Sequence, residues 1–461
     1  MTRAVEVPLW ALALLIGFAA VTFASHFLFP SVRWFVRRRA ERLVARLNQR
    51  LKEPIQPFKL ARRTDTIMRL VHDPQVAQAI ADHAAEEGVP EEVAFETAQR
   101  YAREIVPAFS ATLYFGVATR MARWLSRGLY RVRVSGAERA AGAVGPDVTT
   151  IFVMNHRSNM DYVLVTWLMA RQTSLAYAVG EWARRWPLRP LIRAMGGYFV
   201  RRRDLNPLYR RVLARYVAIA TRAGVTQAVF PEGKLSRDGA LQPPKLGILS
   251  YVLDAWEPGG RDVVFVPIAL NYERVLEDRS LVADQSRPGA AQLSWLAVLA
   301  YFADHLRLRL TGRFARFGYA AVSYGEPLSL SALMAEAPED PAAALGEALM
   351  ARIADVLPVL PVPMVAEAVL SGAGTLDAVA AHLTLRESAL SATHHPVHHA
   401  SRDSRTVAEN ALRLLESRRL LTLAPDGAIA PAPDAPEVLA FYARTLPPPS
   451  DPTAMLHLRK S

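Results

Sequence analysis

A histidine and an aspartate at short spacing follow an apolar run near the middle of the chain. Residues 149–153 (Thr-Thr-Ile-Phe-Val) lead into Asn155 and His156, and Asp161 stands five positions after the histidine. A carboxylate within the next turn can fix an imidazole through one ring nitrogen while the other nitrogen faces a substrate. No serine or cysteine is obviously partnered to His156, so we predict that it acts as a general base on a substrate hydroxyl. On spacing alone, a helix-capping role for this stretch stays open.

Three further polar stretches also follow apolar runs. In 196–203 (Gly-Gly-Tyr-Phe-Val-Arg-Arg-Arg), consecutive arginines cannot all share one face, so at least one can bind a phosphate through its forked donors. In 229–237 (Val-Phe-Pro-Glu-Gly-Lys-Leu-Ser-Arg), one acid and several donors follow a strand. In 266–274 an apolar, proline-containing run turns polar. Taken singly, these stretches are equally typical of a solvated basic patch or an ordinary strand exit.

The elements that must position these loops are short strands alternating with longer helical patterns. The strand-like runs are 130–134, 149–153, 174–179, 228–230 and 263–270. Their alternation with helices predicts an α/β domain with a largely buried sheet, which we place at 129–356. Loops that follow buried strands are where ligands gather in such folds.

The N-terminal part is typical of membrane attachment. Residues 8–29 are almost uninterruptedly apolar, and about 20 such residues span a bilayer. Seven arginines and one acid, Glu41, lie within 33–50, which by the positive-inside rule keeps this flank cytoplasmic. We therefore expect a membrane anchor at 1–32 in the cell (inner) membrane, with the catalytic domain on the cytoplasmic side. A cleaved signal peptide is the rival interpretation.

A basic amphipathic and helical region is predicted at 33–128. The pairs Asp73-Pro74 and Val89-Pro90 indicate helix starts, since proline suits a first helical turn. An amphipathic stretch at 109–125 either packs in the core or dips into the membrane interface. The same two alternatives hold for the apolar segment 293–302.

Composition and the C-terminal part of the sequence limit the classes of partner and the kinds of metal site that we expect. The net charge of +12 favours an anionic partner, and the absence of cysteine excludes disulfides, thiolate metal sites and a cysteine nucleophile. After a proline-rich linker at 357–364, helical patterns predict a small C-terminal helical domain at 365–446. A histidine cluster at 394–399 contains Pro396 and has no nearby acid or cysteine at ligand spacing, so we expect no metal there.

Together, the order and spacing of the four polar stretches resemble the four motifs of the glycerolipid acyltransferase superfamily. The His-x4-Asp motif corresponds to His156 and Asp161, and the other three to 197–202, 230–233 and 266–268. The details His-Arg-Ser-x-x-Asp-Tyr, Phe-Val-Arg-Arg and, at 271–275, Asn-Tyr-Glu-Arg-Val are most similar to glycerol-3-phosphate 1-O-acyltransferases. One departure is Leu235, which stands where the family's third motif usually has an arginine, and this puts one phosphate contact in doubt.

The resemblance implies a mixed acyltransferase-type sheet flanked by helices, and a membrane-bound enzyme of phospholipid synthesis. Such an enzyme moves a fatty acyl group from acyl-CoA or acyl-carrier protein to the 1-hydroxyl of glycerol 3-phosphate, giving lysophosphatidate. His156, oriented by Asp161, would take the hydroxyl proton without an acyl-enzyme, and backbone N–H groups near the third motif would stabilise the oxyanion. Substrate binding would fall to Arg157, Ser158, Arg201, Arg202, Glu232, Gly233, Lys234, Ser236 and Arg237.

The resemblance also bounds the partners. Besides glycerol 3-phosphate and the acyl donor, membrane phospholipid is expected as a partner, with no resident cofactor, no metal and no nucleic acid. Two alternatives remain. One is the same chemistry on lysophosphatidate or another lysophospholipid acceptor. The other is a non-catalytic membrane scaffold or tethered binding module, for which Arg413, Arg418 and Arg419 offer a thin basic set.

Overall fold

The computed structural model describes residues 8–23, 29–141, 145, 147–170, 172–180, 188–201, 205–286, 307, 316–391, 393, 395–399, 401 and 403–448. The predicted segment 293–302 and His394 of the histidine cluster lie outside these residues.

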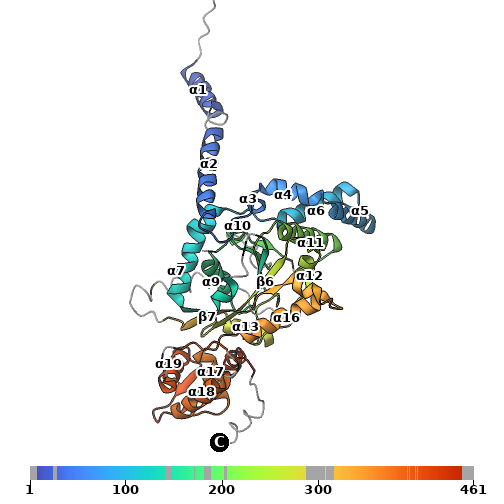
Figure 1. Ribbon diagram of the computed structural model, residues 1–461. Helices are drawn as coiled ribbons and strands as arrows, with labels where there is room; N and C mark the ends of the chain where they lie inside the picture. The colour runs from blue at the N-terminus through green and yellow to red at the C-terminus, as the bar shows by residue number, and fades with distance from the viewer. Residues whose placement is uncertain are drawn as a thin grey trace, which may run out of the picture.

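A mixed sheet forms the centre of the molecule (Figure 1). Its order within the described residues is β1-β7-β6-β2-β5-β3-β4, with β8 paired to β6. The β2, β3, β4, β5 and β6 strands are parallel, whereas β7 and β8 run antiparallel to β6. The strands are β1 (Arg131–Ser135), β2 (Thr149–Met154), β3 (Ala176–Val179), β4 (Tyr198–Phe199), β5 (Gln227–Val229), β6 (Val263–Tyr272), β7 (Tyr319–Tyr324) and β8 (Leu328–Ser329).

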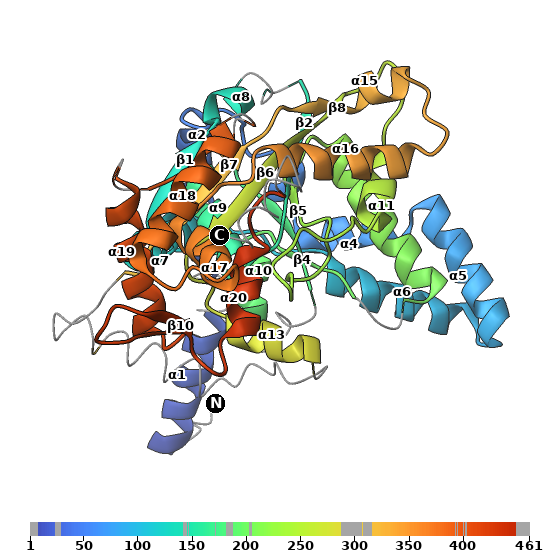
Figure 2. The same cartoon turned by 90° about the horizontal axis from the view of Figure 1, so that it is seen from below.

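Every residue of β2, β6 and β7 is buried, as expected of strands covered on both faces. Successive residues of β2 therefore enter different cores. Phe152 packs with the core beside α9 (Met160–Met169), whereas Ile151 packs with the core beside α11 (Pro207–Arg222). Figure 2 shows helices on both sides of the sheet. The predicted mixed α/β fold is thus confirmed, although β4, β7 and β8 lie outside the strand-like runs of the sequence pattern.

The helical region before the sheet runs from α3 to α7, and its helices are α3 (Pro57–Leu60), α4 (Arg63–Val71), α5 (Pro74–Glu87), α6 (Glu91–Ile105), the π-helix η2 (Thr112–Ala118) and α7 (Thr119–Leu129). The predicted start of α5 is confirmed, because the Asp73 side chain accepts from the N–H of Gln75 and Pro74 fills the first position. The stretch 109–125 has one buried and one exposed face. Ala118 and Ala122 are buried, while Met121 and Trp124 are exposed.

The N-terminal helices are α1 (Leu9–Phe23) and α2 (Phe29–Asn48), which extend away from the sheet domain (Figure 1). The described apolar side chains of α1 include several that are open to solvent, such as Leu9, which is 86% exposed, and Phe18, which is 73% exposed. Among the residues described, no helix has both the length and the apolar character needed to cross a membrane. The predicted transmembrane span is therefore not confirmed.

The remaining helices around the sheet are α8 (Ala137–Ala141), α10 (Leu188–Ala194), α12 (Gly247–Leu253), α13 (Asp278–Ser286), α15 (Leu330–Ala335) and α16 (Pro341–Asp355). The C-terminal elements are α17 (Pro361–Leu370), α18 (Leu376–Ser391), α19 (Ser404–Ser417), the hairpin β9 (Leu421–Leu423) and β10 (Ile429–Pro431), and α20 (Pro436–Ala443). The predicted linker 357–364 is partly wrong. Pro361 and Pro363 lie in the first turn of α17, where a missing N–H breaks no helical hydrogen bond.

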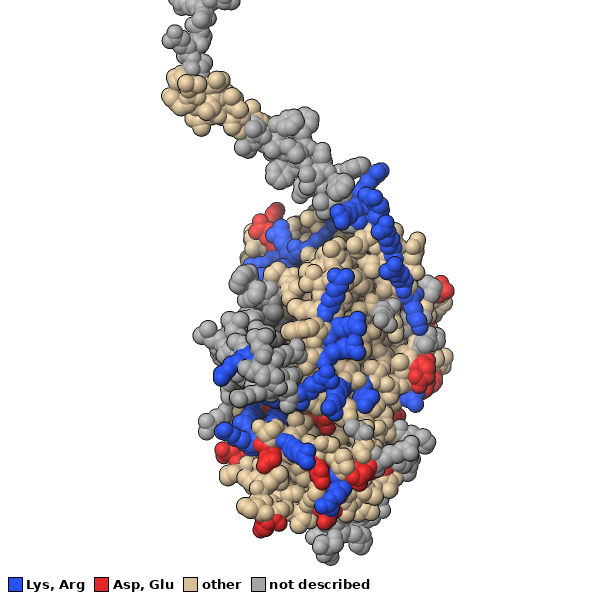
Figure 3. All heavy atoms as spheres, turned by 90° about the vertical axis from the view of Figure 1, so that its left-hand side faces the viewer, with Lys and Arg blue, Asp and Glu red and all other residues tan. Residues whose placement is uncertain are grey.

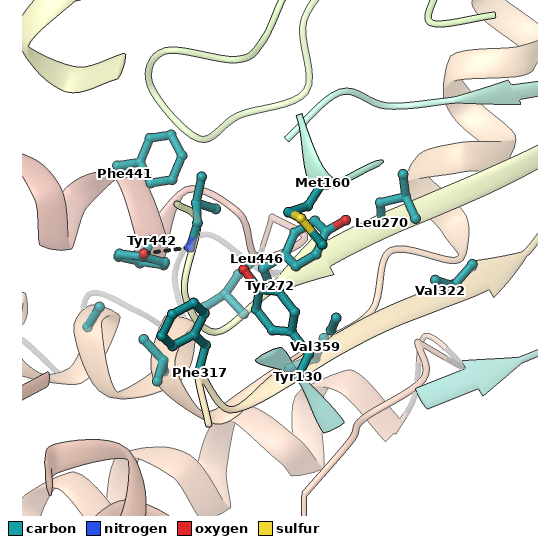
Figure 4. Close-up of a cluster of buried hydrophobic side chains, with 14 of the residues drawn as sticks. Tyr130, Met160, Leu270, Tyr272, Phe317, Val322, Val359, Phe441, Tyr442 and Leu446 are labelled. Atoms are coloured by element: carbon teal, nitrogen blue, oxygen red, sulfur yellow. Dashed lines mark hydrogen bonds between the residues drawn. The ribbon is translucent and has the colours of Figure 1, made fainter. Parts of the chain in front are cut away.

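The C-terminal elements pack against the sheet domain rather than standing apart from it. Figure 4 shows Phe441 and Tyr442 of α20 beside Tyr272 and Phe317, within one buried apolar cluster. The Tyr442 hydroxyl accepts from the N–H of Val275 at 3.0 Å. Gly239 lies so close to α20 that an added Cβ would stand 1.8 Å from the carbonyl oxygen of Phe441.

Polar contacts join the two parts as well. Asn271, at the end of β6, donates its side-chain amide to the carbonyl of Pro358 at 2.9 Å. The buried carboxylate of Asp278 accepts from the Tyr442 hydroxyl and the Arg418 guanidinium. Arg418, one of the three arginines of the binding-module alternative, is therefore occupied by the sheet domain.

Candidate active site

A cleft of about 420 Å³ opens where the parallel strands end. His156 follows β2, Gly180 follows β3, Arg201 follows β4 and Phe230 follows β5, and all four line the cleft. Because these strands are parallel, their carboxyl ends share one edge of the sheet. The sequence therefore brings the first three predicted loops together at the place where open α/β sheets bind ligands.

The predicted histidine–aspartate pair is formed. Nδ1 of His156 lies 2.9 Å from Oδ2 of Asp161, and both side chains are buried. Since Nδ1 is occupied by the carboxylate, Nε2 is the nitrogen left for a substrate in the cleft that His156 lines. This is the geometry that general-base catalysis by a histidine needs.

Asp161 itself is held by four donors. Oδ2 also accepts from the backbone N–H groups of Arg157 at 2.8 Å and Ser158 at 3.0 Å, while Oδ1 accepts from the Tyr272 hydroxyl at 2.7 Å. The carboxylate thus binds the loop before α9 and orients the imidazole at the same time. The capping and catalytic interpretations of this stretch are therefore compatible.

Aromatic rings fix the imidazole further. The Phe230 ring stacks on it with a centroid distance of 4.1 Å, and the Tyr162 ring meets it edge-on at 5.4 Å. Both aromatic residues also line the cleft. Together they keep the ring in one orientation and exclude water from its faces.

Glu232 lies behind the histidine rather than in the lining of the cleft. Its Oε1 accepts from the N–H of His156 at 3.3 Å, and Oε2 has no hydrogen-bond partner among the described residues. Burial raises the pKa of Glu232 to about 7, against the opposing charge of Arg157. Gly233 follows with φ of +70°, a left-handed conformation that turns the chain back after β5.

The predicted phosphate-binding residues that the structure describes do not all line the cleft. Arg201 lines the cleft, and its guanidinium makes two hydrogen bonds, of 2.9 and 2.7 Å, to the carboxylate of Glu104. Arg202 lies outside the described residues. Arg237 pairs with Asp284 at 2.6 Å, and Lys234 is half-buried without being part of the cleft lining.

The remaining predicted residues support the loops. The fully buried Arg157 donates to the carbonyls of Gly239 and Ala240, and neither its Nε nor its Nη2 has a partner among the residues described. Ser158 donates to Glu277 at 2.7 Å. Ser236 donates to the carbonyl of Ala240 at 2.8 Å, and its N–H bonds to the carbonyl of His156.

Several residues of the site were missed by sequence reasoning. Arg210 and Lys245 line the cleft with Arg201, and no acidic residue is found among the described lining residues. Tyr272 stands in the Asn-Tyr-Glu-Arg-Val stretch, so its motif was a usable signal. No comparable signal marks Arg210 or Lys245. Leu235 packs partly buried against the apolar core beside α9, which accounts for the apolar residue at this position.

The cleft joins two chemical surfaces. Its cations favour an anionic substrate group, whereas Val200, Leu213, Val229 and Leu249 supply an apolar wall. No group of three or more His, Asp or Glu side chains lies together as a metal site in the part of the chain that the structure describes. The arrangement suits proton transfer to and from a hydroxyl on a substrate that is part anion and part hydrocarbon.

The comparisons with known proteins include a match to the part of the chain that contains the cleft. The Acyltransferase family model matches residues 131–271. The glycerol-3-phosphate acyltransferase of Aeromonas hydrophila is 32% identical over 278 residues, which are 59% of this chain and 33% of that protein. The enzyme of the same name from Pseudomonas putida is 31% identical over 302 residues, 64% of this chain and 35% of its own.

The chain spans about a third of the length of the curated relatives it matches. Among solved structures, the 1-acyl-sn-glycerophosphate acyltransferase of Thermotoga maritima is 20% identical, with 52% of this chain and 79% of that chain covered and a TM-score of 0.29, a distant likeness only. The residues 131–271 that match the Acyltransferase family model hold His156, Asp161 and Glu232.

Proposed function

We propose that the protein transfers a fatty acyl group from a thioester donor to the 1-hydroxyl of glycerol 3-phosphate, giving lysophosphatidate for phospholipid synthesis. The observation that carries this proposal is the histidine–aspartate pair at a cleft with cations and an apolar wall. The names of the relatives, glycerol-3-phosphate acyltransferases, support the choice of acceptor.

In the proposed reaction, Nε2 of His156 takes the proton from the acceptor hydroxyl as its oxygen attacks the thioester carbonyl carbon. The tetrahedral intermediate collapses by breaking the C–S bond, and the leaving thiolate takes the proton from the imidazolium. Asp161 stabilises that imidazolium through Nδ1, at a distance of 2.9 Å. No acyl-enzyme and no resident cofactor take part, and the donor is acyl-CoA or acyl-carrier protein.

The acceptor phosphate is assigned to the cations of the cleft. Arg210 and Lys245 lie on its wall, and Arg201 is oriented there by Glu104. Among these, an arginine binds a phosphate through two parallel donors, whereas a lysine acts as a point charge. The apolar wall would receive the first carbons of the acyl chain.

The test is acyl transfer by the purified full chain in detergent, with labelled acyl-CoA or acyl-carrier protein and either glycerol 3-phosphate or lysophosphatidate. We expect glycerol 3-phosphate to be preferred, and His156→Ala to lower kcat by about 10²–10⁴ while the protein stays folded. Turnover with lysophosphatidate alone would show that lysophosphatidate, and not glycerol 3-phosphate, is the acceptor. A folded His156→Ala variant with the wild-type rate would refute the catalytic assignment.

We further propose that the N-terminal helices attach the protein to the cell inner membrane, with the catalytic domain on its cytoplasmic side and phospholipid as a partner. Support comes from the exposed apolar residues of α1 and the exposed Arg38, Arg39 and Arg42 of α2. Figure 3 shows basic side chains gathered on the side of the molecule where α2 and α7 lie. Exposed Trp124 of α7 adds an apolar group to that side.

Flotation with vesicles tests the attachment. The full chain should float with vesicles that contain an anionic phospholipid, and deletion of residues 1–50 should reduce the bound fraction. Replacing Arg38, Arg39 and Arg42 by glutamine should make binding weaker and less sensitive to salt. If all three proteins float equally, the attachment lies elsewhere.

A further inference from the structure

A second cavity, of about 210 Å³, lies away from the catalytic cleft. Residues of α3, of the segment after α6 and of α11 line it, together with Ala176 at the start of β3 and Val225 just before β5. Since β2, β3 and β5 are parallel, this is the amino edge of the sheet, whereas His156 follows the carboxyl end of β2. A strand rises about 3.3 Å per residue, so the two sites are separated by roughly 15–20 Å.

A buried lysine points to the kind of ligand. Lys59 of α3 is 9% exposed and lines this cavity. Its ammonium donates to the carbonyl and to the hydroxyl of Ser174, at 2.7 and 3.1 Å, and lies 4.6 Å from the centre of the Phe109 ring. An ammonium has three N–H donors. Both of its hydrogen-bond acceptors within the described residues belong to Ser174, so one donor remains available.

Within the part of the chain that the structure describes, no carboxylate contacts the ammonium of Lys59. Glu53 is the acid that acts on it at longer range, and this carboxylate accepts from the hydroxyls of Thr150 and Thr226 instead. Burial lowers the pKa of Lys59 well below its usual value, and Glu53 opposes this only in part. A buried ammonium that lines a cavity is stabilised when an anion binds beside it.

Apart from the hydroxyls of Thr66 and Tyr216, the other side chains of the described lining are cationic or apolar. Arg63 stands beside Lys59 and is held by the carbonyls of Val106 and Arg103. The apolar surface comes from Phe58, Val106, Phe109 and Tyr216, and no Asp or Glu belongs to the described lining. A cavity of this size is smaller than typical drug-sized sites of about 300–1,000 Å³, which restricts it to a small ligand.

We propose that this cavity is a second ligand site, which binds a small anion carrying a short hydrocarbon part, such as a phosphate monoester or a carboxylate. Lys59 binds the anionic head, and the aromatic and aliphatic side chains cover the hydrocarbon. The site is independent of the catalytic cleft and of the proposed acyl transfer. A lysine with a purely structural role would bind Ser174 and show no response to such ligands.

The chain contains five lysines, Lys52, Lys59, Lys234, Lys245 and Lys460, so the ¹³Cε signals of labelled lysine report each site separately. The full chain in detergent is titrated with butyl phosphate, with butyrate and with uncharged butanol. We expect butyl phosphate or butyrate to shift the Lys59 signal saturably, and butanol to leave it unmoved. The exposed Lys52 serves as an internal control, and Lys245 reports the catalytic cleft.

Variants then separate this site from the first. Lys59→Met should weaken binding of the anion at least tenfold in calorimetry, whereas Lys52→Met and His156→Ala should retain the wild-type Lys59 response or affinity. The relative affinity for butyl phosphate and butyrate identifies the preferred head group. A Lys59 signal that neither anion moves, or that butanol moves equally, overturns the inference even if acyl transfer is established. Conversely, a saturable Lys59 shift supports it even if no acyl transfer is found.

Discussion

The two edges of the parallel strands both bury charged side chains, but with different partners. At the carboxyl edge, Asp161 accepts from two backbone N–H groups, a tyrosine hydroxyl and the ring of His156, which lines a cleft. At the amino edge, Glu53 accepts from the hydroxyls of Thr150 and Thr226 and connects the N-terminal helices to the sheet. The first carboxylate thus orients a titratable group, whereas the second connects segments that lie far apart in the chain.

This difference follows from strand direction. The carboxyl edge is where β2 gives way to the start of α9, so backbone N–H groups are available to fix a carboxylate. The amino edge offers side-chain hydroxyls, and its cavity holds a cation rather than a base positioned by an acid. A polar network at either edge is therefore not enough to indicate catalysis, and the group that the network orients decides its role.

The largest expected effect separates the two carboxylates. Asp161→Asn should lower kcat by about 10²–10⁴, because an amide cannot hold the imidazole in the required tautomer or stabilise the imidazolium. Glu53→Gln should change kcat by no more than about twofold, since it lies at the other edge. Steady-state rates with glycerol 3-phosphate measure both. Similar losses of kcat in the two variants would show that the two carboxylates do not differ in their roles.

The next effect is a pH dependence of stability at the carboxyl edge. The folded protein holds the Glu232 proton up to about pH 7, whereas the unfolded chain loses it near the ordinary value of 4.5. The raised pKa therefore stabilises the folded state fully below pH 4.5, and this contribution is lost as the pH rises through 7. Glu232→Gln should reduce the fall in unfolding free energy between pH 5 and 8 by about 2–3 kcal/mol.

Urea unfolding at the two pH values measures this change. Glu273, whose pKa burial also raises to about 7, contributes with the same sign and keeps part of the slope in the variant. Glu273→Gln, which lies away from His156, should reduce the slope in the same direction. An unchanged slope in Glu232→Gln would mean that its carboxyl titrates alike in both states.

At the amino edge we expect a loss of stability instead. Glu53→Ala should lower the free energy of unfolding by about 1–3 kcal/mol, since it leaves the buried hydroxyls of Thr150 and Thr226 without their acceptor. The exposed Glu86→Ala should change it by less than about 0.5 kcal/mol. Urea unfolding at pH 7 compares them. Equal free energies of unfolding for the two variants would show that Glu53 does not stabilise the fold in this way.

The smallest effect concerns the hydroxyl behind Asp161. Tyr272→Phe removes one hydrogen bond of about 0.5–1.5 kcal/mol and should lower kcat by roughly 2–12-fold with little change in KM. Tyr130→Phe is the matched control, because its hydroxyl donates to the carbonyl of Arg274 instead. If Tyr130→Phe lowers kcat as much, the effect comes from general loosening of the core.

Local patterns predicted the carboxyl edge well. The apolar run of β2 and the spacing from His156 to Asp161 lie within a few residues of each other, so sequence periodicity and chain geometry together fix their relation. The strand–loop order likewise placed Glu232 and Gly233 at the same edge. These features depend on short stretches of chain and on the rule that parallel strands end together.

Long-range pairings were not predictable in this way. Arg201 meets Glu104, 97 residues earlier, and the side chain of Arg157 reaches carbonyls 82 and 83 residues later. Lys59 reaches Ser174 across 115 residues. No local pattern specifies which distant partner a flexible cationic side chain meets, because several carboxylates and carbonyls satisfy it equally well.

The contact between α20 and the sheet domain sets an order of events during synthesis. The hydrogen bond from the Tyr442 hydroxyl to Asp278 cannot form until Tyr442, 164 residues further along the chain, has been synthesised. At about 5–20 residues per second, a ribosome adds that length in roughly 10–30 s. During this interval the nascent chain exposes the apolar surface that Phe441 and Tyr442 later cover. We therefore expect the unfinished polypeptide to be more prone to aggregation than the complete chain.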